Sequence, residues 1–127
     1  MSTLLKLAAL SGAFAVGLGA FGAHGLKSRG VAEADLKVWA TAAQYHLAHS
    51  VGLLALAVAP EKLKTGAMAA CFAVGNLLFA GSLYMMVLTG NRKLGIITPI
   101  GGTFYLLGWA MPLLTDMAGG AGGMKDL

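Results

Sequence analysis

The stretch LLKLAALSGAFAVGLGAFGA, residues 4–23, has a single charged residue, Lys6, and otherwise consists of apolar and small side chains. Its length matches the roughly 20 residues that an α-helix needs to cross the hydrocarbon core of a bilayer. Three more apolar runs follow, at about residues 38–59, 66–88 and 96–115. Backbone N–H and C=O groups in lipid must be satisfied within the protein, so we expect each run to be a helix. The sequence therefore predicts an all-α integral membrane bundle of four transmembrane helices with short loops.

The composition also favours a membrane protein with one domain. Of the 127 residues, 57% are hydrophobic and only 11% are charged, which is too little charge to cover the surface of a water-soluble domain. Four spans with short connections leave room for a single transmembrane domain, which we place at residues 1–117. The glycine-rich residues 118–127 are predicted to form a flexible tail.

The basic residues are scattered singly or in pairs at the ends of the spans. Nine lysines and arginines outnumber five acidic residues, but this scatter does not form a stripe of phosphate contacts, so we expect no nucleic acid partner. Membrane lipids with anionic headgroups are the expected partners of these cations. The cations are nearly balanced across the membrane, and the positive-inside rule leans toward both termini outside.

Small residues on the first span predict a close helix contact. Ser11, Ala15, Gly19 and Ala23 recur at every fourth position and form one small face. Membrane helices associate by van der Waals packing, which small faces allow at short distance. We therefore expect this span to pack against another helix, in this chain or in a partner.

Turn-forming and helix-breaking residues mark the connections. Residues 28–30 predict a turn, after which a helix from Val31 continues without a break into the second span and ends at Pro60. Residues 89–93 contain good turn residues and predict a short hairpin. Pro112 is expected to kink or end the fourth helix.

Three histidines are the polar residues of greatest functional interest. His46 and His49 are three positions apart on the second helix and so share a face. His49 is expected near the middle of the membrane, where ionisable residues are costly and mark functional sites by default. His24 ends the first span on the same side of the membrane and is expected within reach of His46. One interpretation is a site for a metal, a haem or a proton with these three histidines as ligands.

The other interpretation of the histidines is structural. His-x-x-His lacks the His-Glu-x-x-His spacing of a zinc hydrolase. Neutral histidines that bond to backbone carbonyls, to Gln44 or to Asn76 would hold neighbouring helices together. Interhelical polar contacts are the commoner use of such residues, so we favour this interpretation.

No motif predicts an enzyme or a cofactor. Residues 17–22 match G-x-G-x-x-G, but they lie in an apolar span rather than after a strand, so no nucleotide is expected. Ser50, Ser82 and Thr103 have no Asp–His pair in a recognisable arrangement. The sequence therefore predicts a non-enzymatic protein that carries no cofactor.

The remaining polar and aromatic side chains of the spans are interpreted as packing residues. Asn76 is expected to bond between helices, and the lone Cys71 to pack rather than react. Trp39 and Tyr45 are expected at the membrane–water boundary. Ordinary span aromatics are Tyr84, Tyr105 and Trp109.

Five short blocks of the sequence resemble a known family. They are GAFGAHGL at 19–26, WATAAQYHLAHS at 39–50, GSLY at 81–84, TPIGG at 98–102 and GW at 108–109. In this order they resemble a family of small membrane proteins catalogued as domain of unknown function 423, which has a eukaryotic relative called transmembrane protein 256. The resemblance implies a four-span protein of bacterial plasma membranes or of mitochondria, with no established activity.

Two functional hypotheses follow. The first is a non-enzymatic accessory or assembly subunit of a larger inner-membrane complex, with other integral membrane subunits as partners and a respiratory complex as the expected setting. The alternative is a ligand-, metal- or proton-binding membrane protein that uses His24, His46 and His49. The expected location is the bacterial plasma membrane or the mitochondrial inner membrane.

Overall fold

The described part of the chain, residues 1–63 and 65–123, is helical and contains no strand, which confirms the all-α prediction. The π-helical segment η1 continues α1, and a second π-helical segment, η3, joins α3 to α4. The 3₁₀ segment η2 precedes α3, and the 3₁₀ segment η4 precedes α5. The elements of this computed structural model are α1 (Thr3–Ala20), η1 (Phe21–Leu26), α2 (Glu33–Ala57), η2 (Glu61–Leu63), α3 (Gly66–Gly75), η3 (Asn76–Ala80), α4 (Gly81–Thr89), η4 (Arg92–Ile96) and α5 (Ile97–Gly123).

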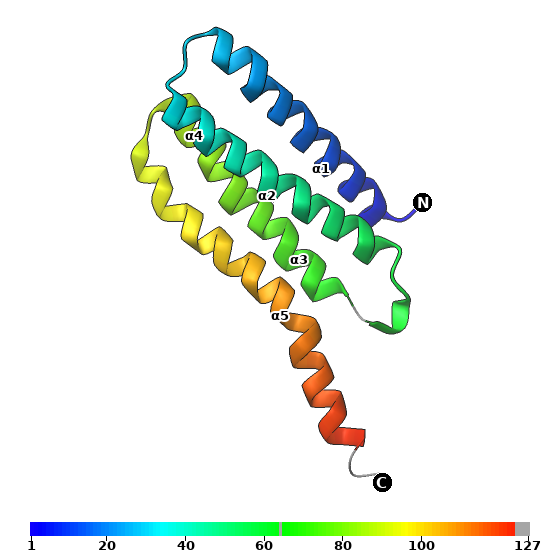
Figure 1. Cartoon of the computed structure of the whole chain (residues 1–127). Coiled ribbons are helices and arrows are strands. Elements are labelled where there is room, and N and C mark those ends of the chain that lie inside the picture. The colour runs from blue at the N-terminus through cyan, green and yellow to red at the C-terminus, as the bar shows by residue number, and fades with distance from the viewer. Residues whose placement is uncertain (64, 124–127) are drawn as a thin grey trace.

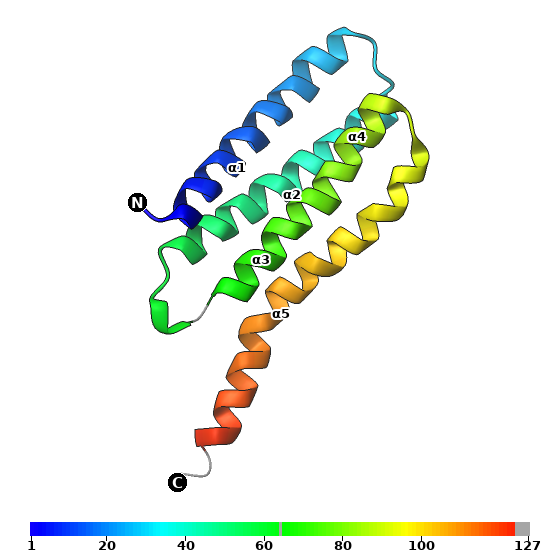
Figure 2. The same ribbon diagram turned by 180° about the vertical axis from the view of Figure 1, so that it is seen from behind.

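The long helices of the predicted bundle form an open row. Figure 1 shows α1, α2, the continuous α3–η3–α4 helix and α5 side by side, and Figure 2 shows the same order from behind. Within the described ranges, α2 is the only neighbouring long helix of α1, and α5 packs on the α3–η3–α4 helix. Apolar side chains gain little by leaving lipid, so helices in a bilayer need not close around a core.

Three of the helices are long and apolar enough to cross a membrane by length and composition. They are Thr3–Leu26, Gly66–Thr89 and Arg92–Met117, with mean hydropathies of 1.8, 1.8 and 1.4. The second predicted span lies on α2, which is 25 residues long but is not among them. Polar residues in the middle of α2, including His46 and His49, lower its hydropathy. Because α2 lies between α1 and the α3–η3–α4 helix, these residues have possible partners on both sides.

The predicted turns are present. Gly30 and Gly90 have φ values of +75° and +73°, the left-handed conformation that glycine adopts without steric cost at the end of a helix. The two turns lie at the same end of the row, where Arg92 donates to Asp35 over 2.7 Å. α2 begins at Glu33, two residues after the predicted start, and ends at Ala57, before Pro60.

The small face of α1 packs on α2, as predicted. Ala15 is buried, and a Cβ added at Gly19 would lie 3.6 Å from the Cβ of Ala43. However, Ala23 is exposed, and Gly22 is buried in its place. At 3.6 residues per turn, a residue at every fourth position drifts by about 40° per step, so three steps carry Ala23 off the face.

Trp39, which is expected at the membrane–water boundary, is buried in the protein core. Its side chain is 1% exposed, and its ring centroid lies 4.7 Å from that of Tyr84. The indole Nε1–H donates to the carbonyl oxygen of Leu18 over 2.6 Å. Gly22 makes room for the ring, because a Cβ there would lie only 2.2 Å from Trp39 Cδ1. The indole thus has a protein partner for its polar group and needs no water.

α5 does not end at Pro112 but continues to Gly123. In Figure 1 the helix changes direction in its orange part, in agreement with the predicted kink. In the tail that is predicted to be flexible, at 118–127, the backbone is helical up to Gly123, and residues 124–127 lie outside the described part. Glycine lowers helix stability by about 1 kcal/mol per residue without forbidding the helix.

Candidate functional site

His46 and His49 lie on the same helix but bond to different neighbours. His46 bonds to side chains of α1 and α4. His49 bonds to a side chain of α5 and to the carbonyl of its own preceding turn. The two imidazoles therefore belong to separate networks, and together these networks tie α2 to the other three parts of the row.

The His46 network is a directed chain of hydrogen bonds. Ser50 donates its hydroxyl proton to the carbonyl oxygen of His46 over 2.7 Å, so Ser11 must be the donor in the 2.6 Å contact between Ser11 Oγ and Ser50 Oγ. The Ser11 oxygen then accepts from His46 Nε2, 3.2 Å away. His46 is therefore the Nε2–H tautomer, and its Nδ1 accepts from the Tyr84 hydroxyl over 3.1 Å.

The His49 network fixes the opposite tautomer. His49 Nδ1 donates to the carbonyl oxygen of Tyr45 over 2.7 Å, since a carbonyl can only accept. Trp109 Nε1 donates to His49 Nε2 over 3.0 Å, since an indole N–H can only donate. The ring is 5% exposed and stacks on Tyr105 with centroids 3.6 Å apart. Both nitrogens of His49 are thus used by the protein.

The two networks differ in what they allow chemically. A proton added to His46 would sit on Nδ1, and Tyr84 can keep the contact by turning from donor to acceptor. A proton or a metal ion at His49 Nε2 would displace the Trp109 donor, and an indole N–H cannot become an acceptor. Only His46 has a partner that can adapt to such a change.

His24 does not join the other two histidines. Its side chain is exposed on η1. Gly22 packs on Trp39, which lies seven residues before His46 on α2. At 1.5 Å per residue, His24 therefore lies about 10 Å or more from His46 along the helix axis. Over the part of the chain that the structure describes, no three His, Cys, Asp or Glu side chains form a group that could hold a metal ion. The expected approach of His24 to His46 is therefore not seen.

Asn76 bonds between helices, as predicted, but only through its oxygen. The Tyr105 hydroxyl of α5 donates to Asn76 Oδ1 over 2.7 Å. The amide nitrogen Nδ2 is buried and has no hydrogen-bond partner among residues 1–63 and 65–123. Asn76 begins the π-helical segment η3, and such segments are frequent at functional sites.

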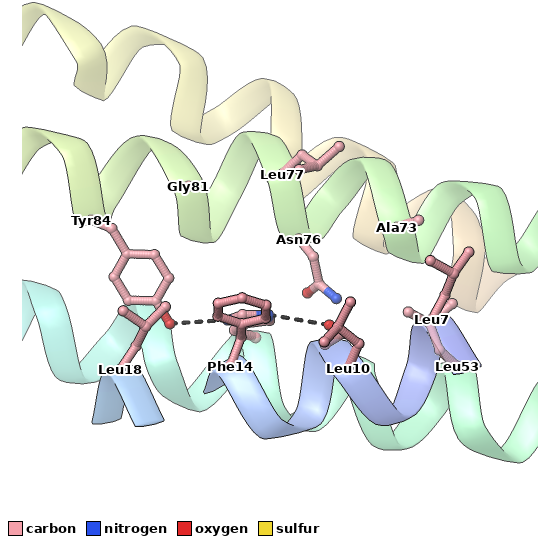
Figure 3. A pocket seen from close by; sticks show the side chains of 12 residues that line it. Leu7, Leu10, Phe14, Leu18, Leu53, Ala73, Asn76, Leu77, Gly81 and Tyr84 are labelled. Carbon is pink, nitrogen blue, oxygen red and sulfur yellow. Dashed lines mark hydrogen bonds between the residues drawn. The ribbon is translucent and has the colours of Figure 1, made fainter. Parts of the chain in front are cut away.

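A groove of about 400 Å³ lies between α1 and the α3–η3–α4 helix, and we call it the lateral groove. Figure 3 shows Leu10 and Phe14 of α1 across from Asn76, with Tyr84 further along the same wall. Most of the lining is apolar, and the polar lining residues are Ser11, His46, Asn76 and Tyr84. The His46 network and the Asn76 side chain, whose buried nitrogen has no partner in the described residues, therefore border one cavity.

The TPIGG block holds α5 against η3. A Cβ added at Gly101 would lie 2.2 Å from the backbone nitrogen of Phe79, so the two helix backbones touch there. Beside this contact, Ser82 donates to the Phe79 carbonyl over 3.0 Å, and the Thr98 hydroxyl therefore donates to Ser82 Oγ over 2.6 Å. This packing positions the aromatic side chains of α5 that contact His49 and Asn76.

The sequence identifies the two histidines of α2 and Asn76 but misses their partners. Tyr84, Tyr105 and Trp109, interpreted above as ordinary aromatics, each donate a hydrogen bond to one of these polar residues. A usable signal is present for Tyr84 and Trp109, because the GSLY and GW blocks contain them and the WATAAQYHLAHS block contains both histidines. Tyr105 lies outside the blocks.

Comparisons with known proteins agree with the resemblance. A family described as "Protein of unknown function (DUF423)" matches residues 18–102. The UPF0382 membrane protein YwdK of Bacillus subtilis is 42% identical over 116 residues, which covers 87% of this chain and 93% of the relative. The UPF0382 membrane protein C1782.12c of Schizosaccharomyces pombe is 38% identical over 117 residues, which covers 88% and 99%.

A further relative, UPF0382 membrane protein SAB0533 of Staphylococcus aureus, is 39% identical over 116 residues and covers 90% of this chain and 94% of its own length. No solved structure matches the chain. The relatives are named membrane proteins, in agreement with the three long apolar helices of this chain. The match covers most of the chain and includes the histidine and TPIGG blocks, and the chain belongs to the DUF423 family of membrane proteins of unknown function.

Proposed function

We propose that the protein crosses the membrane four times and acts, without enzymatic activity, as an accessory or assembly subunit of a larger inner-membrane complex. The membrane is a bacterial plasma membrane or a mitochondrial inner membrane, and a respiratory complex is the expected setting. Other integral membrane subunits are the partners.

The observation that carries this proposal is that most polar side chains of the helices are hydrogen-bonded to other groups of the protein. His46 is bonded through both ring nitrogens to α1 and α4, and His49 through both of its own. Such interhelical bonds hold membrane helices together. Hydrolytic or transfer chemistry needs polar groups that are free to meet a substrate, and these two imidazoles are already used in the packing.

The fourth crossing depends on α2. At 1.5 Å per residue its 25 residues extend over about 37 Å, more than the roughly 30 Å of a hydrocarbon core. Its polar side chains meet partners on neighbouring helices and so need not contact lipid. The ion pair of Arg92 with Asp35 supports a common membrane side for the first and third connections.

The outer helices of the row have free flanks. Val16 on α1 is 60% exposed and Leu106 on α5 is 72% exposed. An outer helix with only one neighbour can take up another helix, since association in lipid relies on packing and not on leaving the solvent. The open row thus offers surfaces for other subunits.

The alternative, a metal, ligand or proton site of His24, His46 and His49, has less support. His24 is exposed on η1. The nitrogens of His49 are bonded to a carbonyl oxygen, which can only accept, and to an indole N–H, which can only donate.

Native electrophoresis tests the subunit proposal. The chain is tagged at its C-terminus, extracted in mild detergent and run on a native gel, and co-migrating chains are identified by mass spectrometry. We expect the protein to migrate within a complex of several integral membrane subunits. An unrelated tagged membrane protein of similar size, extracted in parallel, controls for non-specific association. Migration as a single chain or as a small homo-oligomer would contradict the proposal.

A further inference from the structure

We propose that the lateral groove binds an uncharged hydrophobic molecule, dissolved in the bilayer, that carries a carbonyl oxygen. The Asn76 Nδ2–H group donates a hydrogen bond to that oxygen. This inference goes beyond the subunit role and does not depend on it, because it requires only that the helices lie in a bilayer.

The first reason is the unpartnered donor. Tyr105 occupies the oxygen of the Asn76 amide, and the nitrogen is buried without a partner in the described residues. Buried polar groups are nearly always hydrogen-bonded, so an exception needs an explanation. In lipid the need is greater, since no bulk water can supply the missing acceptor.

The second reason is the shape and place of the groove. Its volume of about 400 Å³ falls within the roughly 300–1,000 Å³ that is typical of small-molecule sites, which are mostly apolar with a few polar groups. No helix packs across it within the described ranges, because α1 contacts α2 and not the α3–η3–α4 helix. Phe14 and Leu77, on opposite walls, are 58% and 74% exposed, so the groove is open to molecules from the side.

The polar groups of the lining favour a ligand that carries a hydrogen-bond acceptor. Ser11, His46 and Tyr84 are already engaged in the directed chain of hydrogen bonds, which leaves the Asn76 nitrogen as the donor without a partner. Figure 3 shows the Asn76 amide directed across the groove toward Leu10 and Phe14 of α1. No acidic residue is among the described lining residues, so a cation has no counter-charge there. A neutral molecule with an oxygen acceptor is the best match.

The depth of Asn76 in the bilayer narrows the class of ligand further. It lies ten residues after Gly66 and thirteen before Thr89, the ends of a long helix, and hence about 15–20 Å from each end. This position is near the middle of a core that is roughly 30 Å thick. The ester carbonyls of phospholipids lie beside the headgroups and do not reach it. The acceptor therefore belongs to a molecule that lies within the hydrocarbon core itself.

Benzophenone is a suitable probe, because it is a neutral, hydrophobic ketone that forms covalent links to nearby C–H bonds when irradiated. The full chain in phosphatidylcholine vesicles is irradiated with benzophenone, and the linked residues are mapped by mass spectrometry. We expect enrichment at the groove residues Leu7, Leu10, Phe14 and Leu77. Dicyclohexyl ketone and dicyclohexylmethane are compared as competitors, because only the ketone has a carbonyl oxygen. In excess, the ketone should reduce the labelling about fivefold more than the hydrocarbon does, since one hydrogen bond is worth ~1 kcal/mol.

Two variants and a matched control complete the test. Asn76→Leu removes the donor at similar volume and should lower the groove labelling about fivefold. Ala73→Leu fills the groove and should also lower the labelling, whereas Ala70→Leu, on the same helix but outside the lining, should leave it unchanged. Because Asn76→Leu also removes the partner of Tyr105, the Ala73 and Ala70 pair tests the site without disturbing that bond.

The outcomes that overturn the proposal are distinct. Labelling spread evenly over lipid-facing residues, or none in the groove, would mean that water or another helix occupies it. Equal competition by the ketone and the hydrocarbon would exclude the hydrogen bond. Equal loss in Ala70→Leu and Ala73→Leu would exclude the groove as the place of binding.

Discussion

Replacing Gly101 by alanine is expected to lower the free energy of unfolding by about 3 kcal/mol, at the upper end of the usual cost of overpacking. The new Cβ would lie 2.2 Å from the backbone nitrogen of Phe79 and 2.7 Å from the backbone carbon of Leu78. Backbone atoms cannot rotate away as a side chain can, so α5 must move off η3. Thermal unfolding in detergent, followed by tryptophan fluorescence, measures the loss.

Gly102→Ala is the matched control for this change. A Cβ at Gly102 would meet the Phe79 ring at 3.6 Å, an ordinary van der Waals contact. Alanine also favours a helix over glycine by up to about 1 kcal/mol. We therefore expect Gly102→Ala to be neutral or slightly stabilising. Equal destabilisation by the two variants would show that the backbone of α5 does not contact that of η3 at Gly101.

Replacing His49 by alanine is the second change with a large expected effect, a loss of about 3 kcal/mol in the free energy of unfolding. The variant removes a buried ring that stacks on Tyr105 and leaves a cavity. It also removes the acceptor of the Trp109 indole N–H, which in lipid has no water to replace it. The measurement is again thermal unfolding in detergent, compared with the wild type.

His24→Ala is the control for His49→Ala, because it removes the same side chain from an exposed position. Exposed substitutions away from special features usually change stability by no more than about 0.5 kcal/mol. A destabilisation of His24→Ala equal to that of His49→Ala would mean that His24 has buried partners and that the three histidines act together.

The helices were predictable from the sequence because hydrophobicity is a local property. Runs such as residues 66–88 are long and apolar enough to indicate a helix by themselves, and the helix observed there is Gly66–Thr89. α2 was recognised as a helix too, but the polar residues that lower its hydropathy have partners on other helices. Whether α2 spans the membrane thus depends on its neighbours and not on its own composition.

The partners of the polar residues could not be predicted in the same way. His46 bonds to Ser11, 35 residues away, and Trp109 to His49, 60 residues away. No local pattern encodes such pairs, because they depend on how the helices pack. Trp39 shows the same limit: a tryptophan at the end of a span suits a membrane boundary as well as a core, and the deciding feature is the missing Cβ of Gly22 on another helix.

The number of membrane crossings is tested most directly by the side from which single cysteines react. In a Cys71→Ala background, the variants Ser2→Cys, Arg29→Cys, Glu61→Cys and Lys93→Cys place one thiol each at exposed positions before or between the long helices. They are treated in sealed vesicles with a membrane-impermeant maleimide. Four crossings predict that Arg29→Cys and Lys93→Cys react from one side and Ser2→Cys and Glu61→Cys from the other. Reaction of Arg29→Cys and Glu61→Cys from the same side would show that α2 does not cross the membrane and would contradict the proposed four crossings.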